Sequence, residues 1–212
     1  MLTVNEIFYS IQGEGAHAGL PCVFIRLTYC NLRCSYCDTE YAFYEGKEYS
    51  IERLIDETEK FNCNLIELTG GEPLLQNEAN PLMTRLCGAG KTVLLETGGS
   101  LSIKDVDKRV CIIMDLKTPS SKMEKKNLYE NILFLKPDDE VKFVIGDRND
   151  YEWTKEKIKE YKIDRKANVL ISPVFGKLEP EEIVDWILED NLNARFQLQT
   201  HKYIWEPDKR GV

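Results

Sequence analysis

The sequence has no excess of positive charge. Its 212 residues hold 28 Lys and Arg against 36 Asp and Glu, which gives a formal net charge of −8 at pH 7. A surface that neutralises phosphates needs a clear basic excess, because cationic side chains make those contacts. Nucleic acid is therefore not expected as a partner.

Long apolar runs are also missing. No stretch approaches the ~18–20 apolar residues that a membrane-spanning helix needs. The N-terminal MLTVNEIFYS has neither a basic stretch nor an apolar signal core. With 13 Gly and 8 Pro, the chain is too poor in both for a fibrous or disordered protein. We expect a soluble, cytoplasmic protein without membrane contact, folded as one domain over residues 1–212, since no repeat or linker divides it.

Histidine is scarce, and a second C-x-x-C pair is absent. The two histidines, His17 and His201, lie far from the cysteine-rich stretch, so the usual four ligands of structural zinc are not assembled by sequence. Seven cysteines are an odd number, which does not fit a disulfide framework. Four of them stand singly in apolar surroundings and are interpreted as small buried side chains. These are Cys22, Cys63, Cys87 and Cys111.

The other three cysteines form a compact group. Cys30, Cys34 and Cys37 make a C-x3-C-x2-C pattern inside a predicted loop at residues 28–40. Three thiolates brought together favour a soft metal, either zinc or an iron–sulfur cluster. A four-iron cluster with three cysteine ligands keeps one iron open to another molecule. The pattern therefore favours a cluster that takes part in chemistry, with zinc as the alternative.

Short β-rich runs alternate with amphipathic stretches along most of the chain. The predicted strands are 22–27, 65–68, 92–96, 110–116, 140–145, 168–172 and 195–199. Residues 5–12 are expected to add an edge strand or hairpin. The predicted helices are 50–61, 80–90, 122–135, 150–162 and 179–190. This alternation predicts an α/β fold with a partial, open βα barrel of about six to seven mostly parallel strands.

Polar and glycine-rich residues follow the predicted strands, at the edge where parallel sheets bind ligands. They are Arg26, Thr69–Pro73, Glu96–Gly99, Asp115–Pro119, Ser172–Pro173 and Gln199–His201. The TGGEP segment is either a tight turn or a place where backbone approaches a ligand closely. Neither G-x-G-x-x-G nor a P-loop occurs, so nucleoside triphosphate chemistry has no support.

The C-x3-C-x2-C loop after the first parallel strand, followed by GGEP after the second, resembles the radical S-adenosylmethionine (SAM) superfamily. The resemblance implies a [4Fe-4S] cluster on Cys30, Cys34 and Cys37, with SAM on the open iron. It also implies a 5′-deoxyadenosyl radical as the reacting species, so no protein side chain is assigned a catalytic role. An electron donor such as flavodoxin or ferredoxin would supply the reducing electron.

Further stretches resemble one branch, the 7-carboxy-7-deazaguanine synthase family of queuosine and 7-deazapurine biosynthesis. They are residues 6–27, 37–39, 68–73, 95–100, 115–121 and 199–203, which span essentially the whole chain. The resemblance implies a Mg²⁺-dependent lyase that contracts the ring of 6-carboxy-5,6,7,8-tetrahydropterin to 7-carboxy-7-deazaguanine with loss of ammonia. It also implies contacts to SAM from Tyr36, Asp38, Gly71, Asp115, Leu116, Lys117, Ser172, Pro173, Val174 and Phe175. Contacts to the pterin are implied for Ile11, Gln12, Gly13, Glu14, Arg26, Thr69 and His201, and Mg²⁺ on Thr39.

Residue chemistry supports parts of this assignment. Arg26 suits a substrate carboxylate and Gln12 a pterin edge. Glu96 and Lys142 are weaker candidates for SAM contacts, since either fits an ordinary charge pair at a strand end. Where relatives often carry Asn in E-T-N-G, this chain has Gly98, which removes a polar group from the expected cofactor site.

Two other functions compete with a pterin enzyme. A radical SAM activase that forms a glycyl radical on a partner protein would need an exposed peptide groove, whereas the polar segments indicate a small-molecule pocket. A non-catalytic iron–sulfur or zinc module would leave the polar strand ends unexplained. An exposed sheet edge on the open side of the barrel favours a homodimer.

Overall fold

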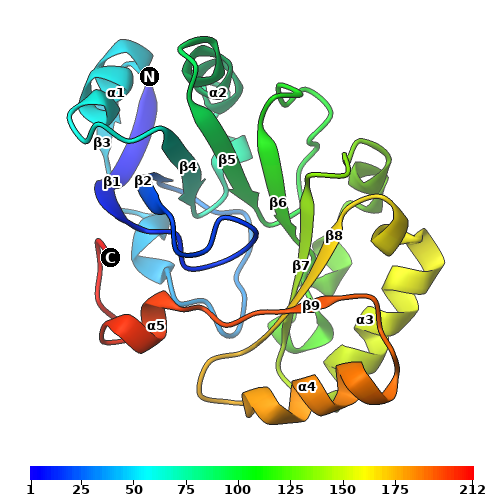
Figure 1. The fold of residues 1–212 in the computed structure, drawn as a ribbon. Coiled ribbons are helices and arrows are strands. Elements are labelled where there is room, and N and C mark those ends of the chain that lie inside the picture. The colour runs from blue at the N-terminus through cyan, green and yellow to red at the C-terminus, as the bar shows by residue number, and fades with distance from the viewer.

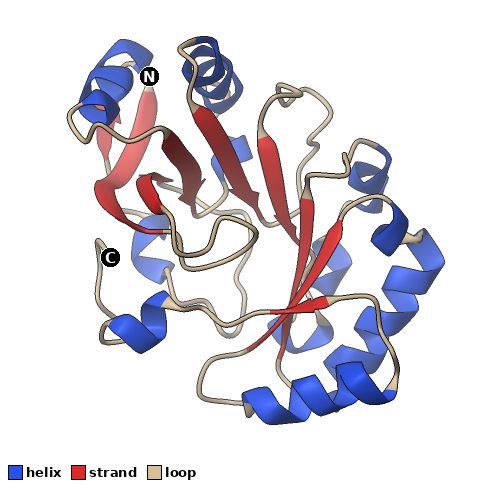
Figure 2. Cartoon of the chain, in the orientation of Figure 1, coloured by secondary structure: helices blue, strands red, loops and turns tan.

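The computed structural model describes all residues 1–212 and contains one nine-stranded sheet with helices packed against it (Figure 1, Figure 2). The strand order is β3-β1-β2-β4-β5-β6-β7-β8-β9. Seven neighbouring strands run parallel. They are β2 (Pro21–Leu27), β4 (Leu65–Gly70), β5 (Thr92–Thr97), β6 (Cys111–Asp115), β7 (Glu140–Ile145), β8 (Asn168–Pro173) and β9 (Arg195–Phe196). This mostly parallel, open and curved sheet confirms the predicted partial barrel, although β9 is shorter than expected.

The N-terminal segment forms the predicted hairpin. Strand β1 (Leu2–Ile11) pairs antiparallel with β2 on one side and with β3 (Lys47–Tyr49) on the other. The loop of residues 12–20 between β1 and β2 lies at the end of the barrel where the parallel strands begin, and its Ala16 amide donates to Glu140, the first residue of β7, at 2.6 Å. The parallel sheet thus begins from an antiparallel edge.

Four helices match the predicted positions within a few residues. They are α1 (Ile51–Glu59), α2 (Ala79–Gly88), α3 (Arg148–Tyr161) and α4 (Pro180–Glu189). Local capping explains two of the starts: Ser50 accepts the Arg53 amide, and Asp147 accepts the Asp150 amide. A short helix, α5 (His201–Ile204), follows β9. None of the helices has the length and apolar character needed to span a bilayer.

The helix predicted at 122–135 is wrong, because this stretch forms only short 3₁₀ turns, at residues 124–126 and 129–133. Asn127 and Asn131 explain the difference. The Asn127 amide exchanges hydrogen bonds with both backbone groups of Lys117, and the Asn131 amide donates to the Leu101 carbonyl. Such side-chain bonds to backbone compete with a regular helix. The stretch therefore follows the adjacent loops and makes no helix of its own.

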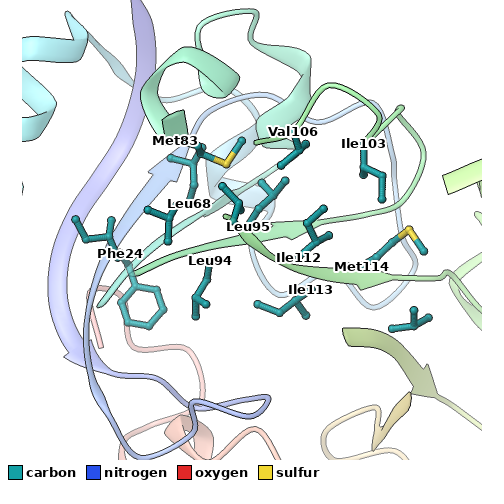
Figure 3. Packing of buried hydrophobic residues seen from close by; sticks show 14 of the residues in the cluster. Phe24, Leu68, Met83, Leu94, Leu95, Ile103, Val106, Ile112, Ile113 and Met114 are labelled. Atoms are coloured by element: carbon teal, nitrogen blue, oxygen red, sulfur yellow. The ribbon is translucent and has the colours of Figure 1, made fainter. Parts of the chain in front are cut away.

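The apolar core lies between the sheet and the helices. Figure 3 shows Met83 of α2 beside Leu68 of β4 and Leu95 of β5, all of them part of one buried cluster. Because side chains alternate along a strand, the opposite face of β4 carries Glu67 and Thr69. Both are buried, so the inner face of the curved sheet carries buried polar groups at β4.

All seven cysteines are free. Cys22 and Cys63 are buried in the apolar cluster, as predicted. Cys87 and Cys111 are only half-buried and pack against its edge.

Candidate active site

A cavity of about 260 Å³ opens at the ends of the parallel strands. Its wall includes the loop of residues 12–20, the cysteine loop, the strands β4 to β7 and the segment after β9. Figure 1 shows that this last segment runs back from β9 through α5 toward β1 and β2. The site residues expected from sequence that line it are Ile11, Gln12, Gly13, Glu14, Arg26, Cys30, Cys34, Tyr36, Cys37, Asp38, Thr39, Thr69, Gly71, Asp115, Lys117, Val174, Phe175 and His201.

Three expected SAM contacts do not line the cavity. The Leu116 side chain is part of the apolar core, and its amide donates to the Lys142 carbonyl at 2.9 Å. Ser172 and Pro173 are buried at the end of β8, paired with β7. Any contact of these three with SAM stays a prediction.

The cysteine loop places three thiols on one wall of the cavity. Cys30, Cys34 and Cys37 are each half-buried, and the Leu32 amide donates to Cys30 Sγ at 3.4 Å. No three His, Cys, Asp or Glu side chains are arranged to hold a single metal ion. Structural zinc takes four side-chain ligands, whereas a four-iron cluster can be held by three cysteines with one iron left open. The set of three cysteines therefore fits a cluster better than structural zinc.

One cation, Lys117, lies close enough to the three thiols to affect their protonation. Burial raises the pKa of each of the three thiols, and the Lys117 ammonium opposes this shift in all three. A cluster binds thiolates, so a fixed cation next to the loop lowers the cost of forming them.

The TGGEP turn after β4 supports the cysteine loop. The Gly71 amide donates to the Leu27 carbonyl at 3.1 Å, and the Glu72 amide donates to the Tyr29 carbonyl at 2.8 Å. A Cβ on Gly71 would lie 2.1 Å from the Tyr29 oxygen, and Gly70 has a φ of +135°. Only glycine permits both features. Because these amides are already used, the turn offers carbonyl oxygens to a ligand, and carbonyls are what a methionyl ammonium needs.

Glu72 connects this turn to the loop after β5. Its buried carboxylate accepts from the Gly98 amide at 2.8 Å, the Thr97 hydroxyl at 2.9 Å and the Leu74 amide at 3.1 Å. A Cβ on Gly98 would lie 2.9 Å from Leu32 Cδ1. A larger residue at position 98 therefore requires the Leu32 side chain to move.

Asp115 and Lys117 form a buried ion pair on the cavity wall. Their side chains meet at 2.8 Å; burial lowers the pKa of Lys117, but Asp115 together with the neighbouring Cys34 and Tyr36 raises it above its usual value. Asp115 Oδ1 is buried and has no hydrogen-bond partner. Tyr36 lies nearby, with its hydroxyl 3.3 Å from Thr118 Oγ1. The wall thus presents an unused carboxylate oxygen and an aromatic ring, which suit hydroxyl groups and a purine.

Lys142 is the centre of a second buried charge group. Its ammonium donates to Glu14 Oε2 at 2.9 Å, contacts the Glu96 carboxylate at hydrogen-bond distance and lies 4.0 Å from Asp115 Oδ2. Burial alone lowers its pKa, but Glu14 and Glu96 outweigh burial and raise it well above the usual value. Lys142 is therefore charged and holds the floor of the cavity together.

Gln12 and Glu67 lie beside this group. The Gln12 Nε2 donates to Glu67 Oε2, and Gln12 Oε1 accepts the Glu14 amide at 3.1 Å. Burial raises the pKa of Glu67 well above its usual value, and the neighbouring Glu96 and Glu14 raise it further. These two contacts fix the orientation of the Gln12 amide, with its nitrogen toward Glu67 and its oxygen toward the Glu14 amide.

Arg26 reaches the cavity at the end of β2. Its Nε donates to Glu6 Oε1 at 2.7 Å, and the same oxygen accepts the Tyr41 hydroxyl at 3.0 Å. The guanidinium also lies 5.6 Å from the Phe8 ring centre. This ion pair is largely buried, unlike an ordinary surface pair, and it holds Arg26 by one nitrogen. The two terminal nitrogens remain for a carboxylate.

The segment after β9 covers the opposite side of the cavity. Lys202 donates to Asp38 Oδ2 at 2.6 Å, and Thr39 Oγ1 donates to Asp38 Oδ1 at 2.9 Å. A Cβ on Gly13 would lie 2.4 Å from His201 Nδ1, so His201 packs directly on the loop between β1 and β2. Residues 207–212 also line the cavity, and Arg210 lies 3.8 Å from the centre of the Tyr41 ring.

Several lining residues were not identified from sequence. Glu67 and Lys202 carry the clearest roles. Glu67 has a usable signal, because it is the only charged residue in the apolar run LIEL. Lys202 has none, since its pairing with Asp38 joins positions 164 residues apart.

The fold and the cavity define a radical SAM domain: the sequence profile of the Radical SAM superfamily matches residues 24–189, more than half of the chain. A 7-carboxy-7-deazaguanine synthase of Koribacter versatilis is 42% identical, and one of Chlorobaculum tepidum is 44% identical. Each alignment covers 100% of this chain, with 100% and 97% of the respective relative. The chain therefore belongs to the 7-carboxy-7-deazaguanine synthase family of radical SAM enzymes. The crystal structure of QueE from Escherichia coli has the same fold, with a TM-score of 0.76 at 21% identity over 92% of this chain and 93% of that one.

Membership of the radical SAM superfamily implies a [4Fe-4S] cluster and SAM. The three thiols, the glycine turn and the free Asp115 oxygen fit these two groups.

Proposed function

We propose that the protein converts 6-carboxy-5,6,7,8-tetrahydropterin into 7-carboxy-7-deazaguanine, a ring contraction with loss of ammonia, as a lyase in 7-deazapurine and queuosine biosynthesis. The names of relatives that align over the whole chain support this substrate. The single observation that carries the proposal is the composition of the cavity. One wall holds the cluster cysteines, and the rest holds buried polar groups suited to a small heterocyclic acid.

Cluster and SAM, when bound, supply a radical that abstracts hydrogen. The chain's own residues bind and orient the substrate. Arg26 directs its free guanidinium nitrogens to the carboxylate, while Gln12, directly after β1, and Thr69 of β4 bind the heterocycle. The segment after β9 covers the site and limits the entry of water, which protects a reactive intermediate.

We also propose that Mg²⁺ binds at Thr39. The Thr39 hydroxyl and the adjacent Asp38 carboxylate are hard oxygen donors on the cavity wall. Magnesium accepts few protein ligands when substrate and water supply the others. Thr39→Val removes the hydroxyl and keeps the shape, so we expect Mg²⁺ to stop stimulating turnover. Equal stimulation of the variant and the wild type would contradict this assignment.

The electron donor and the assembly complete the proposal. A reduced flavodoxin or ferredoxin would supply the electron, and a homodimer would cover an open edge of the sheet at β3 or β9. Size-exclusion chromatography with light scattering tests the second point directly.

The decisive experiment is anaerobic reconstitution with iron and sulfide, followed by incubation with SAM, reductant, Mg²⁺ and 6-carboxy-5,6,7,8-tetrahydropterin. Mass spectrometry is expected to detect 7-carboxy-7-deazaguanine and 5′-deoxyadenosine. If 5′-deoxyadenosine forms while the pterin survives, the chain is a radical SAM enzyme with another substrate. A peptide-activating role would then be tested next.

A further inference from the structure

Glu67 is a buried carboxyl in the cavity for which neither the cluster nor the ion pairs account. It lies on the inner face of β4, is 2% exposed and lines the cavity. The nearby Lys142 pairs with Glu14 and Glu96 instead. Burying a charged carboxylate without a cation is costly, so this position calls for an explanation.

The contact between Glu67 and Gln12 indicates a role in orienting the Gln12 amide. Gln12 Nε2 donates to Glu67 Oε2, and Gln12 Oε1 is occupied by the Glu14 amide. Glu67 thus fixes which end of the Gln12 amide faces the cavity. The hydrogen bond uses one Glu67 oxygen and leaves Oε1 for a ligand.

We propose that Glu67 is a substrate-binding residue that orients the Gln12 amide and donates a hydrogen bond from its second oxygen to an acceptor atom of the heterocycle. The inference rests on the proposed pterin substrate and deepens it. A 2-amino-4-oxopyrimidine ring carries a carbonyl oxygen and a ring nitrogen as acceptors. A neutral carboxyl group between an amide and such a ring satisfies both neighbours.

The surrounding charges keep Glu67 protonated. Burial raises its pKa, Glu96 from β5 and Glu14 from the loop after β1 raise it further, and Gln12 and Lys142 oppose them only in part. Cys22 faces it from β2, and burial and Glu67 itself raise the pKa of that thiol, so the thiol stays neutral. A deprotonated Glu67 would be the third carboxylate beside one ammonium. Donation by Glu67 is therefore lost as pH rises through its elevated pKa.

Two substitutions of similar size at Glu67 distinguish hydrogen bonding to the substrate from simple filling of space. Glu67→Gln keeps an acceptor for Gln12 and an N–H donor toward the cavity, but cannot titrate. Glu67→Met keeps the volume and removes both hydrogen bonds. Glu181→Gln, on the exposed first turn of α4, is the control for loss of one negative charge.

The probe is pterin-6-carboxylate, measured by equilibrium dialysis against the cluster-loaded enzyme with SAM. We expect Glu67→Met to bind it about five- to tenfold more weakly, as the loss of about one buried hydrogen bond implies. Glu67→Gln and Glu181→Gln should bind within about twofold of wild type. Wild-type binding should weaken toward high pH, whereas Glu67→Gln should show no such weakening.

Turnover and SAM cleavage provide independent measurements. In Glu67→Met the KM for the tetrahydropterin should rise by the same factor as the loss of affinity for the probe, whereas Glu181→Gln should keep the wild-type KM and the wild-type rate of 5′-deoxyadenosine formation without pterin. Wild-type affinity in Glu67→Met, or equal losses in both Glu67 variants, would overturn the proposal. If the wild-type enzyme fails to bind pterin-6-carboxylate, the pterin assignment fails and the role of Glu67 fails with it.

Discussion

Replacing Lys142 with Met should destabilise the protein more than any change at a surface ion pair. The Lys142 side chain is 4% exposed and is the only ammonium within 4.0 Å of both Glu14 and Glu96. Its loss leaves these carboxylates buried side by side. Removing one partner of a buried ion pair costs about 3–5 kcal/mol.

That cost is large enough to measure easily. For a chain of this size, 1 kcal/mol corresponds to about 2–4 °C in melting temperature. The Lys142→Met variant should therefore melt roughly 6–20 °C below the wild type. The matched control is Lys155→Met, because Lys155 pairs with Glu152 at 3.0 Å and Asp190 at 2.7 Å at the surface. An exposed pair contributes about 1 kcal/mol or less.

The difference between variant and wild type should depend on pH in a defined direction. Burial raises the pKa of Glu14, but Lys142 together with the Gln199 amide and His201 lowers it below 4.5. The pKa of Lys142 is raised from 10.5. The lowered carboxyl pKa stabilises the folded protein above pH 4.5, and this stabilisation is lost as the pH falls through the folded-state pKa. The raised lysine pKa stabilises the folded protein below pH 10.5. The full difference is therefore expected between these values and should shrink in acid.

Anaerobic thermal melts of the cluster-loaded proteins at pH 7 measure the first effect, and urea denaturation of the cluster-free proteins at pH 7 and pH 4 measures the second, both followed by circular dichroism. A Lys142→Met variant within 1 kcal/mol of wild type at pH 7 would refute the reasoning. So would a loss that is the same at both pH values.

Three further substitutions test the cavity. Cys34→Ala should abolish cluster absorbance and SAM cleavage while the circular dichroism spectrum is retained, and full turnover would contradict cluster ligation by Cys34. Arg26→Ala should raise the KM for the pterin by about tenfold or more, as loss of a charge-assisted hydrogen bond of about 1.5–3 kcal/mol implies, and should spare SAM cleavage without pterin. Loss of both pterin binding and SAM cleavage would instead show that Arg26 stabilises the cysteine loop. Gly71→Ala forces a Cβ to within 2.1 Å of the Tyr29 oxygen, so cluster incorporation per chain should fall, and a normal iron content would show that the loop can adjust.

Most of the fold was predictable because its signals are local. Each parallel strand is a short apolar run, and each long helix has a periodic apolar face; the helix predicted at 50–61 is observed as α1, with Ser50 as its N-cap. The helix predicted at 122–135 is wrong because hydrophobic periodicity does not report hydrogen bonds between side chains and the backbone. Asn127 and Asn131 bond to loops that lie nearby only in the folded chain.

The site was predictable where its residues end a strand, as Arg26, Thr69 and Asp115 do. The sheet register then places them at one edge without further information. Residues that act through a partner distant in sequence were missed. Glu67 lies within a predicted apolar strand, and its contact with Gln12 joins positions 55 residues apart.

The glycine turn after β4 shows why the pattern that marks this site is also structural. Gly71 approaches Tyr29 closely enough to exclude a Cβ, and the Glu72 amide bonds to the same carbonyl. The Glu72 carboxylate then accepts the Gly98 amide from the next loop. The loops after β2, β4 and β5 consequently form one hydrogen-bonded unit. A substitution in the third loop should therefore move the cysteines in the first, because a buried carboxylate that loses one donor shifts toward the donors that remain.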